Sequence, residues 1–235
     1  MLWHGDEPRH YGDFVGRPEV LNTLRQIGQG KKVLDLGCGE GYLSRKASDI
    51  AAKVIGIDNS ERMITLAKNR EKQEKRGIEY LVGDVTSLPF QEAEFDVCVG
   101  CHITNYIHPD KLPLFYQGVS KVLVSDGQFI LLMPHPALIL CTDYGEALDY
   151  GLPEFDYFGS RGKFYTATAK TAQGTTLEVG LYHSTFEDHL NAIASANLRV
   201  HKVEPLVFSM EIAGKYPIFS KMGGKVANII ILGGK

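Results

Sequence analysis

The sequence predicts an α/β fold: a doubly wound, mostly parallel seven-stranded sheet with helices on both faces and an antiparallel last strand. Three observations support this prediction. Short apolar runs alternate with helix-like segments from about residue 30 onward. A glycine-rich turn follows the first run, as in Rossmann-like folds. The last two runs have no clear crossover helix between them, so the final strand is expected to run antiparallel to its neighbours.

Seven apolar runs have the length and composition of buried strands. They occupy residues 32–37, 53–57, 78–82, 95–99, 128–133, 198–204 and 226–232. Helical periodicity covers residues 42–52, 109–124 and 185–197. A further helix is expected to begin after Ser60, a good N-cap, and to stop at Gly77.

We expect residues 1–235 to form a single domain, with residues 134–182 as an insertion that covers the ligand edge of the sheet. The insertion contains no strong periodicity and is rich in aromatic residues. A lid over a ligand and a small satellite core are both compatible with that composition. Residues 205–224 form a second long irregular connection, and such connections are usually functional.

Composition narrows the classes of partner. The formal net charge is -3, with 25 Lys and Arg against 28 Asp and Glu, so a nucleic-acid partner is not expected. No apolar run is long enough to cross a bilayer, and the N-terminus lacks the halves of a signal peptide. The four cysteines form no disulfide pattern, which predicts a reducing, cytoplasmic location.

The sharpest motif follows the first predicted strand. Gly37, Gly39 and Gly41 let the backbone turn tightly and approach a ligand at the start of a helix. A dinucleotide fold needs its third glycine one position later, where Tyr42 stands. Asp35, on the strand itself, suits a cationic ligand better than a pyrophosphate.

Two acidic residues end the next two predicted strands. Asp58 follows Gly37 by 21 positions, close to the spacing of about 20 residues for an acid that binds ribose hydroxyls. Asp84 follows Gly83 at the end of the third strand. The carboxyl ends of parallel strands meet at one edge, so the three motifs predict one ligand site there.

In order, the chain reads D-L-G-C-G-E-G at 35–41, G-I-D-N-S at 56–60, G-D at 83–84 and F-D-V at 95–97. This order and spacing resembles the class I S-adenosylmethionine (SAM)-dependent methyltransferase family, of the small-molecule type, over roughly residues 30–133. The resemblance implies SAM as cofactor, S-adenosylhomocysteine as product and no metal. It implies methyl transfer to a small-molecule acceptor, with the O, N or C atom left open.

The resemblance also implies the residues that hold the methionine part of SAM. Asp35 would lie near the cofactor's amino group, and Cys101 would flank the methyl group. Tyr11 and Arg17 precede the first predicted helix, in a segment that would fold over the cofactor. The turn that shapes this part of the pocket would comprise Gly37, Cys38, Gly39 and Gly41.

The ribose and adenine of SAM would be held further along the chain. The resemblance implies that Asp58 binds the ribose diol. The residues that would border the adenine are Asn59, Met63, Gly83, Asp84 and Val85.

The acceptor side is less defined by the sequence. A general base is needed only for a hydroxyl or protonated amine acceptor. His183 is the first candidate for that base, followed by His135 and His102, and Tyr106 is a candidate for orienting the acceptor. The acidic residues scattered through the insertion favour a neutral or cationic acceptor over a polyanion.

Two alternatives remain at this point. The aromatic insertion would suit an RNA-nucleoside methyltransferase acting on a flipped base, although the acidic balance disfavours a phosphate track. A SAM-binding regulatory protein without catalysis is the other. Methylation of an amide or adenine by an N-P-P-Y device is not expected, because residues 100–106 read G-C-H-I-T-N-Y. Cys98 and Cys101 lack the second pair that a zinc site needs.

Overall fold

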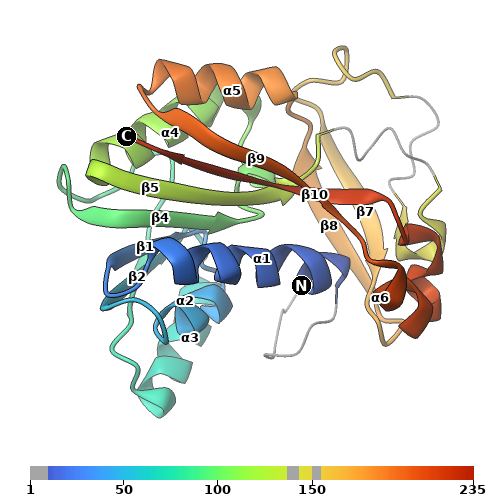
Figure 1. The fold of residues 1–235 in the computed structure, drawn as a ribbon, viewed down its shortest axis with the longest axis horizontal. Helices are drawn as coiled ribbons and strands as arrows, with labels where there is room; N and C mark the ends of the chain where they lie inside the picture. Colours follow the sequence, from blue (N-terminus) through green and yellow to red (C-terminus); the bar gives the residue numbers. More distant parts are fainter. Residues whose placement is uncertain (1–9, 137–142, 150–154) are drawn as a thin grey trace.

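The computed structural model describes residues 10–136, 143–149 and 155–235 (Figure 1). At its centre lies a seven-stranded sheet with the order β3-β2-β1-β4-β5-β10-β9. Its strands are β1 (Lys32–Leu36), β2 (Lys53–Asp58), β3 (Glu79–Val82), β4 (Phe95–Cys101), β5 (Leu123–Pro134), β9 (Arg199–Val207) and β10 (Val226–Gly234).

The strand directions match the predicted fold class. Strands β1 to β5 pair in parallel, and β10 runs antiparallel to both β5 and β9. All seven predicted strands are present, and the antiparallel last strand is confirmed. The strand order reverses beside β1, and the crevice outside the strand ends at such a point is where open α/β sheets bind ligands.

Helices cover both faces of the sheet, as predicted (Figure 1). One buried cluster joins one face to α4 and α5, and a second joins the other face to α1, α2 and α3. These helices are α1 (Tyr11–Ile27), α2 (Tyr42–Ala47), α3 (Glu61–Glu74), α4 (Leu112–Val122) and α5 (Phe186–Ser195).

Three predicted helix ends differ from the structure. The helix predicted over 42–52 ends at Ala47, and the one predicted over 109–124 is a 3₁₀ turn, η2 (Pro109–Lys111), followed by α4. Pro113 lies in the first turn of α4, where its missing N–H is tolerated. The Ser60 hydroxyl caps α3 by accepting the Met63 N–H at 3.3 Å, as predicted. That helix ends at Glu74, before Gly77, because Lys75 adopts a left-handed conformation.

An N-terminal helical segment at the ligand edge was expected and is present, but Tyr11 and Arg17 were placed before the first helix, and that placement is wrong. Tyr11 and Arg17 lie inside α1, whose start is closed by a capping box between His10 and Asp13. Gly16 lets α1 approach β5 closely, since a Cβ atom there would come within 2.5 Å of the Leu132 side chain. This contact fixes the start of α1 over the ends of the strands.

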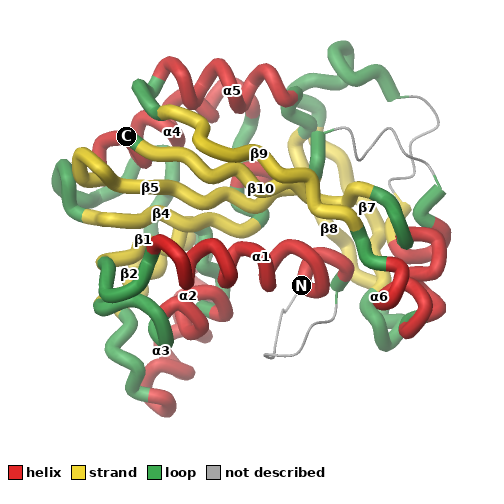
Figure 2. Tube along the Cα trace, viewed as in Figure 1, coloured by secondary structure: helices red, strands yellow, loops and turns green. Residues whose placement is uncertain are grey.

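The insertion contains regular structure that its sequence was not expected to form. A small antiparallel sheet consists of β6 (Leu148–Asp149), β7 (Phe164–Lys170) and β8 (Thr176–Tyr182) (Figure 2). A third buried cluster joins it to Tyr11, to α6 (Met210–Lys215) and to the 3₁₀ segment η5 (Pro217–Met222). The second irregular connection therefore supports the insertion from outside the main sheet. Residues 137–142 and 150–154 of the insertion lie outside the described residues.

Candidate functional site

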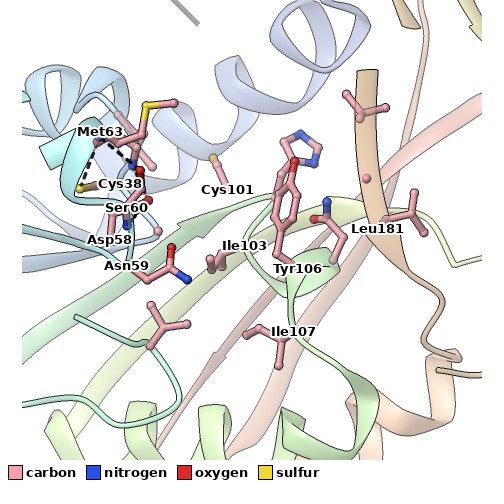
Figure 3. Close-up of a pocket in the computed structure, with 18 of the residues that line it drawn as sticks. Cys38, Asp58, Asn59, Ser60, Met63, Cys101, Ile103, Tyr106, Ile107 and Leu181 are labelled. Atoms are coloured by element: carbon pink, nitrogen blue, oxygen red, sulfur yellow. Dashed lines mark hydrogen bonds between the residues drawn. The ribbon is translucent and has the colours of Figure 1, made fainter. Parts of the chain in front are cut away.

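A cavity of about 740 Å³ opens at the carboxyl ends of the parallel strands. Ligand pockets commonly have volumes of about 300–1,000 Å³. Its walls come from the start of α1, the turn after β1, the ends of β2 and β4, the 3₁₀ turn η1 (Thr104–Tyr106) and strand β8. Figure 3 shows Asp58, Asn59 and Ser60 on one side of it, Tyr106 and Leu181 on the other, and Ile103 between them.

The glycine turn and Asp58 form one hydrogen-bonded unit. Gly37, Gly39 and Gly41 all have positive φ angles, 69°, 55° and 86° respectively, which residues with a side chain rarely adopt. The Gly39 N–H donates to one carboxylate oxygen of Asp58, and the Ser60 N–H donates to the other, both at 2.9 Å. A carboxylate oxygen accepts more than one hydrogen bond, so Asp58 retains capacity for a ligand.

Asp35 is a buried carboxyl group on the cavity wall. It is 1% exposed and accepts a hydrogen bond of 2.5 Å from the Ser44 hydroxyl. Burial raises its pKa to about 7, with a smaller contribution from the negative charge of Asp58. A cationic ligand beside it would lower that pKa again.

Arg17 is held at the same end of the cavity. Its guanidinium forms an ion pair with Asp13 at 3.0 Å and lies 4.5 Å from the centre of the Tyr42 ring. Its positive charge helps to keep His102 neutral and opposes the rise in the pKa of Asp35. Arg17 and Tyr11 both line the cavity.

Four of the five residues predicted to border the adenine line the cavity. Asn59, Met63, Asp84 and Val85 line the cavity. Asp84 is fixed by accepting hydrogen bonds of 2.8 Å from the backbone N–H and the hydroxyl of Thr86.

Two predicted glycines shape the cavity from behind its wall. A Cβ atom at Gly41 would come within 2.4 Å of the Tyr80 hydroxyl, and one at Gly83 within 2.7 Å of Ile57. Neither glycine is among the residues that line the cavity. Because they lack a Cβ atom, these glycines allow Tyr80 and Ile57 to pack closely against the backbone behind the cavity wall.

The two cavity cysteines are thiols held in the protonated form. Burial raises the pKa of Cys101 to about 12 and raises that of Cys38 well above the usual value. Among the described residues, no group of three or more His, Cys, Asp or Glu side chains is arranged to hold a metal ion. The cysteines therefore contribute shape and apolar surface.

The candidate acceptor-side residues fall into two groups. His102 and Tyr106 line the main cavity. Burial lowers the pKa of His102 to about 3, so its imidazole is neutral at physiological pH. His135 and His183 line a separate space of about 30 Å³ behind the wall and do not reach the main cavity.

His183 is built into the base of the insertion. It is 2% exposed, and its Nε2 lies 2.7 Å from the Tyr157 carbonyl oxygen. Since a carbonyl only accepts, Nε2 carries the proton and donates it there. The imidazole also makes edge contacts with the rings of Phe155 and Tyr157. These contacts indicate that His183 packs and supports the base of the insertion.

Sequence reasoning missed one wall of the cavity. That wall comes from β8 and from the segment between η1 and α4, and its members are Asn105, Ile107, His108, Lys111, Val179, Gly180, Leu181 and Tyr182. Six of the aromatic residues expected in this role do not line the cavity, and they are Tyr144, Phe155, Tyr157, Phe158, Phe164 and Tyr165. The seventh, Tyr150, lies outside the described residues. Alternation of small and large side chains along 164–182 was the available signal for the β7–β8 hairpin.

Comparisons with known proteins agree with this geometry. Residues 33–127 match the family model described as a methyltransferase domain. The chain is 36% identical over 124 residues to a demethylmenaquinone methyltransferase of Lactococcus lactis subsp. lactis, covering 49% of this chain and 48% of that protein. It is 35% identical over 96 residues to a ubiquinone biosynthesis O-methyltransferase of Pelagibacter ubique, covering 41% and 39%. The chain thus spans about half or less of the length of these curated relatives.

A solved structure extends the likeness to nearly the whole fold. A putative S-adenosylmethionine dependent methyltransferase from Listeria monocytogenes superposes with a TM-score of 0.70 at 22% identity, covering 94% of this chain and 96% of that one. Fold and cavity thus define a doubly wound α/β protein with a ligand site at its strand ends. Residues 33–127 are similar to the methyltransferase domain family, and the whole chain shares its fold with that solved structure.

Proposed function

We propose that this chain transfers a methyl group from SAM to a small-molecule acceptor. The observation that carries the proposal is one continuous cavity, which joins the three strand-end motifs to a wall supplied by β8. The names of the two curated relatives, both quinone-related methyltransferases, support a small organic acceptor.

The glycine turn and Asp58 fit the nucleoside half of SAM. Each Asp58 oxygen is already oriented by one backbone N–H, so the carboxylate is preorganised to accept the two ribose hydroxyls. Asn59, Met63 and Val85 would then border the adenine, with Asp84 at its polar edge. These assignments rest on the cavity wall and on the family motifs together.

The other end of the cavity fits the amino acid half of SAM. Asp35 is a buried carboxyl group with one hydroxyl partner, suited to an ammonium group. Arg17, held by Asp13 and Tyr42, supplies the positive charge that a carboxylate needs. Cys101 lines the cavity between Cys38 on one side and Tyr106 on the other (Figure 3).

SAM supplies a methyl group on a positively charged sulfonium, which is already a good leaving group. The chain's own task is therefore to position the acceptor and exclude water. Tyr106 and His102 are polar groups at the acceptor side, and a neutral His102 is able to accept a hydrogen bond. We assign the acceptor-facing role to this pair in place of His183 and His135.

The two alternatives have less support. An RNA substrate would favour a basic surface, whereas the net charge is -3. A purely regulatory SAM-binding protein would not need the acceptor wall of β8. No helix among the described residues has the length and hydropathy to span a membrane. The cytoplasmic location stays a prediction.

The proposal is tested in two stages with the intact chain. Calorimetry should detect binding of S-adenosylhomocysteine but not of NAD, and Asp58→Ala should weaken that binding at least tenfold, because two ribose hydroxyls lose partners at about 1–3 kcal/mol. Asp126→Ala, at an exposed position on β5, is the control. Radiolabelled methyl transfer from SAM is then screened against metabolite and RNA pools. Binding of NAD alone, or label only in RNA, would refute the proposal.

A further inference from the structure

Charged side chains are unevenly distributed around the cavity. The acidic residues on its wall all belong to the half assigned to SAM, and they are Asp13, Asp35, Glu40, Asp58 and Asp84. Each is engaged within the protein. Glu40, for example, pairs with Arg45 at 3.1 Å and with Arg70 at 3.4 Å. This half therefore has the negative potential that suits a cationic cofactor.

The half of the cavity assigned to the methyl acceptor carries a positive charge. Lys111, at the start of α4, lines the cavity there. Its ammonium makes no hydrogen bond or ion pair with residues 10–136, 143–149 or 155–235. The nearest acid in sequence, Asp110, is engaged by Arg161 at 2.9 Å, and Arg161 also pairs with Asp188 at 2.7 Å. Lys111 is therefore available to a ligand.

The acidic residues of the insertion do not offset this charge. Asp143 pairs with Lys221 at 2.9 Å, Glu146 pairs with Lys170, and Asp156 accepts the Phe158 N–H at 3.0 Å. None of the three lines the cavity. The expectation of a neutral or cationic acceptor rested on these three acids together with Asp149 and Glu154. Asp149 does not line the cavity either, and Glu154 lies outside the described residues, so the described acids of the insertion give that expectation no support.

The remaining acceptor wall is mainly apolar, with one unpaired polar atom. Ile107, Pro134, Val179 and Leu181 supply apolar surface. The buried Oδ1 of Asn105 has no hydrogen-bond partner among the described residues. A buried oxygen that can accept a hydrogen bond but has no partner favours a ligand that carries an N–H or O–H group.

We propose that the acceptor is an organic monoanion: an apolar body with a carboxylate-type group that binds Lys111 and a donor group that reaches Asn105. The inference rests on the proposed function, because it names the substrate class of the same site. The apolar wall accounts for affinity, and Lys111 accounts for selection of the acid over its neutral analogue.

The test compares an acid with its uncharged isostere. Affinities of 2-naphthoate and 2-naphthamide are measured by calorimetry on protein saturated with S-adenosylhomocysteine. We expect wild-type protein to bind the acid about fivefold more tightly than the amide, the size of an exposed ion pair. Lys111→Gln should abolish this preference. Lys121→Gln, at an exposed lysine of the same helix, should retain it.

The outcomes separate this inference from the proposed function. Equal affinity for acid and amide in wild-type protein would overturn the anionic acceptor, and so would a preference that survives in Lys111→Gln. In either case, intact binding of S-adenosylhomocysteine would leave the methyltransferase proposal standing. Failure to bind S-adenosylhomocysteine would refute the proposed function itself.

Discussion

Asp35 gives cofactor binding a dependence on pH. Burial raises the pKa of this carboxyl group to about 7, and the ammonium of the cofactor would bind its ionised form. Below that pH the carboxyl must lose a proton when ligand binds, so affinity should fall by up to tenfold per pH unit. We expect calorimetry of S-adenosylhomocysteine between about pH 5 and pH 8 to show this loss on the acidic side.

Asp35→Asn provides the control for that prediction, because an amide does not titrate. Its affinity should be lower at neutral pH and nearly constant across the range. Proton release on binding, measured in buffers of different ionisation enthalpy, should disappear in the same variant. A wild-type profile that stays flat below pH 7 would contradict the contact between Asp35 and the ammonium.

The two histidines His102 and His183 should respond differently to substitution. His102 lines the cavity, so His102→Ala should lower methyl transfer while leaving S-adenosylhomocysteine affinity within about tenfold, or about 1.4 kcal/mol. His183→Ala removes the part-buried hydrogen bond to the Tyr157 carbonyl and the ring contacts of a buried imidazole, which should lower the folding free energy by about 1–3 kcal/mol. Steady-state assays and urea unfolding of both variants distinguish these effects. Full turnover in His102→Ala with loss in folded His183→Ala would reverse our assignment.

At the scale of elements, the close packing of α1 on β5 depends on Gly16. A Cβ atom there would overlap the Leu132 side chain at 2.5 Å, and overpacking of this kind typically costs about 1–3 kcal/mol. We therefore expect Gly16→Ala to lower the free energy of unfolding in urea. Because α1 carries Tyr11 and Arg17, cofactor affinity should fall as well.

A matched glycine in α6 makes this prediction specific. A Cβ atom at Gly214 would meet nothing within 4 Å. Gly214→Ala should therefore be neutral or stabilise the protein by up to about 1 kcal/mol, since alanine restricts the unfolded chain. Equal destabilisation by both substitutions would mean that space beside Leu132 is not the determinant.

The elements that the sequence predicted are those with a strong local period. The buried strands of the main sheet and the amphipathic face of α4 bury apolar side chains at regular spacing, and all were found. An N-terminal helical segment was expected, but the bounds of α1 were not predicted, because Gly12, Gly16 and Pro18 are poor helix formers and the helix is stabilised by tertiary packing. The β7–β8 hairpin was missed because its outer face is polar and its partner surfaces lie far away in sequence.

In the candidate site too, one half was predictable from the sequence and the other was not. Its cofactor half is made of residues that end consecutive strands, so a linear motif is enough to name Asp35, Asp58 and Asp84. Its acceptor half is assembled from η1, the start of α4 and β8. No local pattern links Lys111 to Leu181, and only the folded arrangement brings them to one wall. His183 ranked first by sequence position, yet its burial against Tyr157 was not readable there.

At the scale of the whole molecule, opposite charges are separated between the two halves of one cavity. The acids collect where a cationic cofactor is proposed, and Lys111 stands on the acceptor side. The net charge of -3 shows no overall basic excess in the chain. The arrangement suits a small ligand and disfavours a polyanion.

Nucleic acids should therefore bind this protein weakly and with little dependence on salt. Counterion release makes log affinity fall with log salt by about 0.9 for each phosphate contact on duplex DNA and about 0.7 on single strands. With Lys111 as the cation on the acceptor wall and Arg17 paired with Asp13, we expect a slope no steeper than about 2 for duplex DNA and for bulk RNA. Filter binding across a salt series, with and without S-adenosylhomocysteine, measures it. A slope of about 5 or more would require a basic track elsewhere on the surface and would restore the RNA substrate as the better reading of the acceptor wall.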